Sequence, residues 1–231
     1  MTLLARPALP TVIDTSTKLT AHEAAALYQA GVRSVWRYVF FGPPRAGDLD
    51  AAELQLLLAA GLTVMVVQHV RNPGWTATAD QGDADGQVAV ANAMKAGYQS
   101  AGGALSLAVD LEGCKSPHAD QYAMAWCAQA RAGGYLPVCY IGFASGMTSA
   151  DLDRLGPDVA LWCDFAPLSL RPSPQRGYAL HQQAQTTLCG VGVDVDAILV
   201  PGALVGLGDG DVNAESVDPL HDTEKPPPDA A

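Results

Sequence analysis

The sequence has few charged residues, and few of those are basic. Charged residues make up 16% of its 231 positions, and 13 Lys and Arg stand against 24 Asp and Glu, which gives a formal net charge of −11. Nucleic acids and anionic membranes attract proteins with a basic face, so we expect neither a nucleic-acid partner nor a membrane-surface one. The sequence also offers no convincing membrane-spanning run, because the apolar stretch 54–67 is short and is interrupted by Gly61.

Paired cysteines, nucleotide-binding loops and an export signal are absent as well. The five cysteines are an odd number and include no C-x-x-C pair, which excludes a disulfide framework and a zinc-finger spacing. No predicted strand leads into a G-x-G-x-x-G or G-x-x-x-x-G-K-[ST] loop. The first twelve residues hold one Arg and no sustained apolar stretch, which makes a poor signal peptide. We therefore expect a soluble protein without a nucleotide site.

Hydrophobic residues, in contrast, make up 49% of the sequence, which is enough for a large core. They alternate between β-rich runs and segments with helical periodicity, two of which open on the capping-box spacings Thr20–Glu23 and Asp50–Glu53. Another helix is expected to begin with Ser116 as its cap and Pro117 in its first turn. Strands are predicted at residues 11–14, 34–39, 63–69, 105–112, 136–141, 159–164, 178–182 and 192–196. Helices are predicted at residues 20–31, 50–61, 86–100, 116–131 and 148–155, with a loop at 72–85.

This alternation predicts a mainly parallel sheet. Eight strands are enough for the sheet to close, and the last ones leave little room for helices. We therefore predict an α/β fold, a TIM-like (β/α) barrel with irregular, helix-poor last strands, and keep an open doubly wound sheet as the alternative. The barrel domain is expected at residues 1–205. Residues 206–231 form an acidic, Pro- and Gly-rich C-terminal tail that we expect to be disordered and to offer a site for a protein partner.

Polar residues end almost every predicted strand, and most of them are acidic. In parallel barrels, functional residues gather at the carboxyl ends of the strands. A purely structural barrel has no need of five carboxylates at one mouth, so this edge is the predicted site. The strand-ending polar residues are Asp14, Arg37, Tyr38, Gln68, His69, Asp110, Glu112, Tyr140, Asp164, His181, Gln182, Asp194 and Asp196.

The strand that ends at residues 108–112, with the sequence AVDLE, is the most informative. Side chains alternate along a strand, so Ala108, Asp110 and Glu112 share a face directed into the barrel, and the leucines meet the helices. The two carboxylates lie ~7 Å apart along the strand, where like charges and burial raise their pKa values. One can then stay protonated while the other is ionised, as glycoside hydrolysis requires. Helix caps, solvated loop residues and a divalent-cation site are the alternative interpretations.

Aromatic and histidine side chains near the same mouth are candidate substrate contacts. The apolar faces of sugar rings pack on aromatic rings, although ordinary core packing is the alternative for each of these residues. Trp162 shares strand parity with Asp164, which favours a place in the pocket. His69 and His181 are candidate acid–base groups, and a structural hydrogen bond is the commoner role for such a histidine. The aromatic candidates are Trp36, Tyr38, Trp75, Tyr140 and Trp162.

A series of short motifs, in order along residues 11–200, carries a family resemblance. The motifs are VID at 12–14, AGVRSVWRY at 30–38, AGLTV at 60–64, the Gly/Asp loop and Ala-rich helix at 82–93, LAVDLE at 107–112, GYLPVCY at 134–140, ALWCD at 160–164, HQ at 181–182 and VDVD at 193–196. Together they resemble the glycoside-hydrolase-like barrel family long catalogued as a domain of unknown function. That family is related to the family-25 lysozymes, which are N-acetylmuramidases.

The resemblance implies roles for several of the strand-ending residues. Glu112 matches the general acid of the lysozymes, and Asp110 matches its carboxylate partner. These residues and the aromatic and histidine candidates above form one predicted site, for which we expect neither a metal ion nor a cofactor. The expected catalytic residues are Glu112, Asp110, Asp14 and Asp164, and the expected substrate-binding residues are Tyr38, His69, Tyr140, Trp162, Gln182 and Asp194.

Two functions of different class fit this site. The first is a glycoside hydrolase of lysozyme type that cleaves peptidoglycan, or a related amino-sugar polymer, by carboxylate acid–base catalysis. The alternative is a non-catalytic carbohydrate- or cell-wall-binding module on the same barrel, and the presence of Glu112 favours the enzyme. The sequence leaves open the exact glycan, the anomeric outcome and the oligomeric state. Because no export signal is recognised, we expect the chain to stay cytoplasmic until it is released or delivered to the cell wall.

Overall fold

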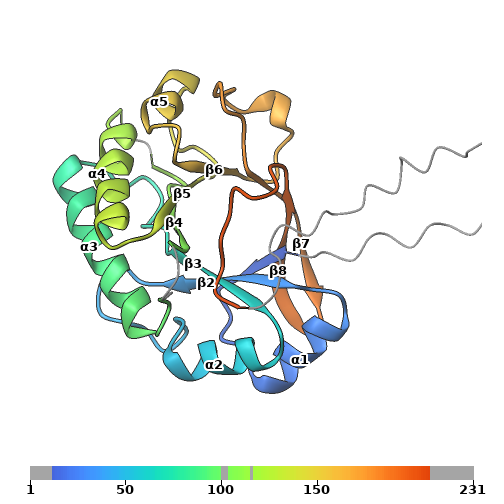
Figure 1. The fold of residues 1–231 in the computed structure, drawn as a ribbon. Coiled ribbons are helices and arrows are strands. Elements are labelled where there is room, and N and C mark those ends of the chain that lie inside the picture. The colour runs from blue at the N-terminus through green and yellow to red at the C-terminus, as the bar shows by residue number, and fades with distance from the viewer. Residues whose placement is uncertain (1–11, 100–103, 115–116, 209–231) are drawn as a thin grey trace, which may run out of the picture.

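Eight β-strands close into one barrel in the computed structural model, which describes residues 12–99, 104–114 and 117–208 (Figure 1). Each strand pairs with its neighbour in chain order, and the last strand returns to the first. The predicted barrel is confirmed, and the open doubly wound sheet is excluded. The strands are β1 Val12–Thr15, β2 Ser34–Val39, β3 Thr63–Gln68, β4 Ser106–Asp110, β5 Leu136–Ile141, β6 Ala160–Cys163, β7 Leu180–Leu188 and β8 Val191–Ile198.

Helices cover the barrel only along its first six strands. Within the described residues, a single 3₁₀ turn, η1 (Leu168–Leu170), separates β6 from β7, and no helix separates β7 from β8. Figure 1 shows the helices in an arc around the barrel from α5 through α4, α3 and α2 to α1, with β7 and β8 in the part that this arc leaves open. The prediction of helix-poor last strands is therefore confirmed. The helices are α1 Ala21–Gln29, α2 Ala51–Ala59, α3 Ala79–Lys95, α4 Ala119–Ala132 and α5 Ser149–Arg154.

Alternation along the strands separates two apolar layers. On β4, Leu107 and Val109 belong to the larger cluster between the sheet and the helices, whereas Ala108 belongs to a smaller cluster inside the barrel. The inner cluster is centred on Trp36 and Trp162, whose rings stack with centroids 5.2 Å apart. The predicted facing of this strand is confirmed, and the barrel is filled by side chains below its mouth.

The direction of β8 differs from a simple parallel barrel. β8 pairs antiparallel with both β7 and β1, and the register places Asp194 beside Asp14 and Asp196 beside Val12. Because β8 runs from the mouth toward the opposite end, Asp194 lies at the mouth and Asp196 lies deeper. The prediction that both residues close a strand at the mouth is therefore wrong for Asp196.

The predicted loop at residues 72–85 is wrong in its second half, because α3 already begins at Ala79 with Thr78 as its cap. The Gly/Asp-rich composition indicated a loop. The structure instead uses the glycines for helix packing: a Cβ atom on Gly86 would lie 2.8 Å from Gln129 Cβ of α4, and one on Gly82 would overlap the Tyr122 carbonyl. Figure 1 shows α3 and α4 side by side. The next helix, α4, is capped at His118, two residues after the predicted cap Ser116, which lies outside the described residues.

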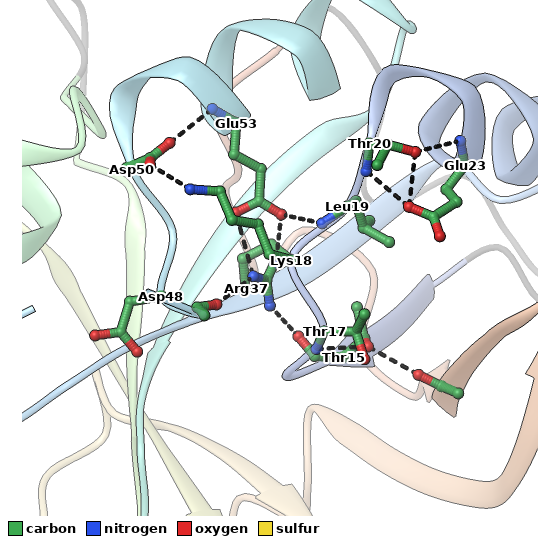
Figure 2. A network of polar contacts seen from close by, with 12 residues as sticks. Thr15, Thr17, Lys18, Leu19, Thr20, Glu23, Arg37, Asp48, Asp50 and Glu53 are labelled. Atoms are coloured by element: carbon green, nitrogen blue, oxygen red, sulfur yellow. Dashed lines mark hydrogen bonds and ion pairs between the residues drawn. The ribbon is translucent and has the colours of Figure 1, made fainter. Parts of the chain in front are cut away.

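A buried ion pair connects the ends of β1 and β2 to α2 (Figure 2). Arg37 donates to Glu53 (Nε to Oε1, 2.8 Å), and both side chains are fully buried. Glu53 also accepts the backbone N–H of Leu19 (2.7 Å), while Arg37 donates to the carbonyl oxygens of Thr15 and Gly47. The capping box predicted at Asp50 is thus only half formed, because Glu53 turns inward to Arg37. The box predicted at Thr20 is confirmed.

The end of the barrel opposite the mouth is closed by the chain that follows β8. Leu204 is buried in the inner cluster, the Val205 N–H donates to Ser106 Oγ (2.9 Å), and Leu207 pairs with Val64 of β3. Residues 206–208 of the predicted tail therefore lie against the barrel. The rest of that tail, and the N-terminal residues 1–11, lie outside the described residues. No helix in the described ranges is both long and apolar enough to traverse a bilayer.

Candidate active site

A cleft opens at the carboxyl ends of the parallel strands. Most of the residues proposed from the sequence line it. Asp14 is hydrogen-bonded to the lining residues Tyr38 and Gln182, and Asp164 directly precedes the lining residue Phe165. The cleft also includes three residues that were not among the candidates: Val67, Phe165 and Gln185. Its full lining is Tyr38, Val67, Asp110, Glu112, Tyr140, Trp162, Phe165, Gln182, Gln185 and Asp194.

Glu112 is the exposed carboxyl of this cleft. Its backbone is fixed, since its N–H donates to Asp110 Oδ1 (2.8 Å) and its carbonyl accepts from Trp75 Nε1 (3.4 Å). Its carboxyl group has no hydrogen-bond partner within the described chain. Partial burial raises the pKa of Glu112, and the charges of Asp164 and Asp194 raise it further. A carboxyl that is solvent-accessible, has no hydrogen-bond partner among the described residues and has a raised pKa is suited to donate a proton.

Asp110 sits directly beneath Glu112 and is buried. Burial raises the pKa of Asp110 well above its ordinary value, and the charges of Glu112 and Asp14 add to this effect. The hydrogen bond from the Glu112 N–H lowers the pKa but does not offset burial. Asp110 therefore holds the Glu112 backbone in place. Its raised pKa favours the protonated form of the Asp110 carboxyl group.

Asp14 is the centre of a polar network that crosses the barrel. Tyr38 donates to Asp14 Oδ1 (2.8 Å), and the amide of Gln182 donates to both Asp14 Oδ2 (3.2 Å) and Asp194 Oδ2 (3.0 Å). Tyr140 completes the network by donating to Gln182 Oε1 (2.9 Å). Burial, helped by the charge of Asp194, raises the pKa of Asp14 to about 7 in spite of the hydrogen bonds it accepts. Burial likewise raises the pKa of Asp194.

Asp164 differs from the other acids of the site because it forms an ion pair with a basic side chain. Its Oδ2 forms an ion pair with Arg171, and its Oδ1 accepts the backbone N–H of Ala166 (3.3 Å). Asp164 is buried, yet its charge is still felt at Glu112. Arg171 lies in the irregular segment between β6 and β7. The sequence analysis considered only residues at the ends of strands and therefore did not identify it.

Two predicted substrate contacts have other surroundings. Trp162 is fully buried at the floor of the cleft, where its Nε1 donates to Asp196 Oδ1 (2.9 Å). His69 does not line the cleft: its Nε2 lies 3.2 Å from Asp48 Oδ1, and its ring packs against Tyr38 with centroids 4.7 Å apart. His69 therefore supports Tyr38 from outside the cleft.

Gly142, just after β5, is a positioning residue that the sequence did not reveal. A Cβ atom at this position would lie 2.6 Å from Glu112 Cβ and 2.8 Å from Tyr140 Cε1. Only glycine lets the two neighbouring side chains approach so closely. The signal in the sequence was the Ile-Gly step directly after a strand, which alone does not distinguish a close approach from a turn.

The arrangement suits proton donation next to a stabilised anion. Glu112 can supply a proton at the surface of the cleft, while Asp164 and Asp194 place negative charge nearby. Side-chain amides and phenols surround these groups and are suited to bind hydroxyl and acetamido groups. No three of the described His, Cys, Asp and Glu side chains are grouped so as to hold a metal ion.

Comparison with known proteins gives a family match over most of the chain. Residues 25–198 match the family described as Rv2525c-like, glycoside hydrolase-like domain. No curated protein matches the sequence.

Solved structures share the fold at low identity. The Tat-secreted protein Rv2525c of Mycobacterium tuberculosis, in complex with L-tartrate, is 18% identical, with a TM-score of 0.58 over 84% of this chain and 97% of that one. A muramidase from Trichobolus zukalii is 14% identical (TM-score 0.55; 79% and 90% covered). A lysozyme from Streptomyces coelicolor is also 14% identical (TM-score 0.52; 83% and 92% covered). At these identities the likeness shows the fold alone.

Proposed function

The chain belongs to the Rv2525c-like glycoside hydrolase-like family, and from that premise we propose that it is a glycoside hydrolase of lysozyme type. The proposed substrate is peptidoglycan or a related amino-sugar polymer. The observation that carries the proposal is the state of Glu112: an accessible carboxyl with a raised pKa and no hydrogen-bond partner in the described chain, in a cleft with Asp164 and Asp194. The low-identity relatives named as muramidase and lysozyme support the same reaction class.

In the proposed reaction, Glu112 gives its proton to the glycosidic oxygen as the bond between that oxygen and the anomeric carbon breaks. The leaving sugar departs with a hydroxyl group. Positive charge that develops on the remaining ring is stabilised by the carboxylates of Asp164 and Asp194. Water then adds to the anomeric carbon and returns a proton to Glu112.

The remaining candidates have binding and positioning roles in this proposal. Asp110 fixes the backbone of Glu112, and Asp14 fixes the orientation of Tyr38 and Gln182. Tyr140 keeps Gln182 pointing its amide nitrogen at the acids. Trp162 forms the floor, and His69 supports Tyr38.

The test is release of reducing ends from purified peptidoglycan by the wild-type chain and by Glu112→Gln. Loss of a general acid lowers such rates by about 10²- to 10⁴-fold, and we expect a loss in this range. The matched control is Asp80→Asn, which makes the same carboxyl-to-amide change on the exposed first turn of α3, away from the cleft lining, and should retain wild-type release. Equal release by Glu112→Gln would refute the assigned acid. Retention of glycan without release by the wild type would favour the binding-module alternative.

A further inference from the structure

One aromatic side chain of the cleft, that of Phe165, is largely exposed to solvent. Phe165 follows β6 directly and is 61% exposed, yet it lines the same cleft as Glu112 and Asp194. Large apolar side chains exposed singly are common on protein surfaces. Phe143, which follows β5 and is 68% exposed outside the cleft lining, is such a case. Phe165 differs from Phe143 because its side chain lines the cleft.

The backbone on both sides of Phe165 is anchored. Asp164, immediately before it, is held by Arg171 and accepts the N–H of Ala166, immediately after it. The Ala166 carbonyl in turn accepts a hydrogen bond from His181 Nε2 (3.2 Å). The ring is therefore presented from a fixed segment rather than from a free loop, which lowers the entropy lost when a ligand packs on it.

The other aromatic residues of the cleft are buried or half-buried, and each packs against a neighbouring ring. Trp162 is stacked on Trp36 and buried. Tyr140 packs edge-on against Trp162, with centroids 4.8 Å apart, and Tyr38 packs against His69. The tyrosine hydroxyl groups are occupied by Gln182 and Asp14. Of the four aromatic residues in the described lining, Phe165 alone is largely exposed.

We propose that Phe165 is the stacking platform for one pyranose ring of the glycan that lies across Glu112. This inference rests on the proposed function and refines its substrate class. The face of a phenyl ring is negatively polarised and attracts the C–H hydrogens of an apolar sugar face. A β-linked gluco-configured ring has only equatorial substituents, so its faces present C–H groups alone. An axial hydroxyl would make one of the two faces polar, so Phe165 favours gluco-configured sugars, which can stack through either face.

The experiment measures binding separately from turnover. A soluble tetrasaccharide of alternating N-acetylglucosamine and N-acetylmuramic acid is titrated calorimetrically into Glu112→Gln, which keeps the ligand intact. The same titration is made with Phe165→Ala, Phe165→Trp and Phe143→Ala, each in the Glu112→Gln background. Because both phenylalanines are exposed, neither substitution disturbs the core.

Phe165→Ala should weaken binding by about tenfold, in line with the loss of aromatic contact and buried area. Phe165→Trp should restore or improve the affinity, and Phe143→Ala should bind as its parent does. In the active chain, Phe165→Ala should raise KM and leave kcat within about twofold, since this contact is made equally in the ground and transition states. Equal affinity of Phe165→Ala and Phe143→Ala overturns the platform and leaves the proposed function standing. Failure of the wild-type chain both to bind the tetrasaccharide and to release reducing ends overturns both.

Discussion

At the scale of single residues, Glu112 and Asp164 are neighbouring acids that differ in one partner. Arg171 pairs with Asp164, whereas the carboxyl of Glu112 has no partner among the described residues. The negative charge of Asp164 raises the pKa of Glu112, and the positive charge of Arg171, which is paired with Asp164, opposes this effect. Arg171 therefore sets how strongly one acid acts on the other.

Replacing Arg171 by Met should raise the pKa of Glu112 further, because the charge of Asp164 is then uncompensated. The neighbouring carboxyl groups of Asp194 and Asp110 are unchanged by the substitution. The measurement is a ¹³C-carboxyl titration by NMR after selective glutamate labelling, which gives five signals from the five Glu of the chain. Arg171→Lys keeps the charge and should leave the Glu112 titration close to wild type. A lower or unchanged pKa in Arg171→Met would contradict this account.

Strand parity was enough to predict most of the acids in the cleft. Asp14, Asp110 and Glu112 follow from the period of two and from the rule that parallel strands end at one edge. Asp194 lies at the mouth for another reason, because β8 is antiparallel and its register places Asp194 beside Asp14. Phe165 and Arg171 did not follow, because they lie after β6 in a segment without periodicity. The direction of a side chain in such a segment is decided by contacts with distant residues, such as that between Ala166 and His181.

At the scale of elements, the pair α3 and α4 shows where composition misleads. The glycines and aspartates of residues 79–86 have low helix propensity and predict a loop. The helix forms because α4 needs small residues on the facing surface, and Gly82 and Gly86 bring the two backbones close together. Tertiary packing here outweighs a local preference of about 1 kcal/mol per glycine.

Gly82→Ala should destabilise the protein although alanine favours helices. The gain in propensity is about 1 kcal/mol. Overlap of the new methyl group with the Tyr122 carbonyl costs about 2–3 kcal/mol, the upper part of the usual range for overpacking, because a backbone atom cannot move aside. Urea unfolding should show a net loss of about 1–2 kcal/mol. The control is Ala84→Gly on the exposed face of the same helix, which should lose about 1 kcal/mol from propensity alone. A more stable Gly82→Ala would show that α3 and α4 are not closely packed.

At the scale of the whole molecule, the mouth of the barrel and the layer beneath it hold a cluster of acids whose pKa values are raised by burial. Asp14, Asp110 and Asp196 are all buried and all share this direction. Between the ordinary pKa near 4 and the raised one, the folded chain binds more protons than the unfolded chain. Its free energy of unfolding therefore falls as the pH rises through that window.

Asp14 makes this prediction measurable, because burial raises its pKa from 3.8 to about 7. The wild-type chain should be more stable at pH 5 than at pH 8, with Asp14 responsible for a few kcal/mol at most, since a pKa difference of one between the folded and unfolded chain corresponds to about 1.4 kcal/mol. Asp14→Asn removes this titration and keeps an acceptor for Tyr38, so its stability should depend less steeply on pH. Urea midpoints at pH 5, 6, 7 and 8 decide the matter, with Asp80→Asn as the surface control. The same slope in Asp14→Asn and in the wild type would disprove the role of Asp14.

The antiparallel course of β8 also fixes which way the barrel faces when it is attached to something. β1 starts at Val12 on the end away from the cleft, β8 finishes at Ile198 on that same end, and Leu207 follows there beside Val64. Both exits of the described chain therefore lie at the pole opposite the acids. A bead, a dye or a second protein joined through either exit therefore starts on the side of the barrel opposite the cleft. Immobilisation by either route should leave the cleft facing outward, where the insoluble polymer that we propose as the substrate can reach it.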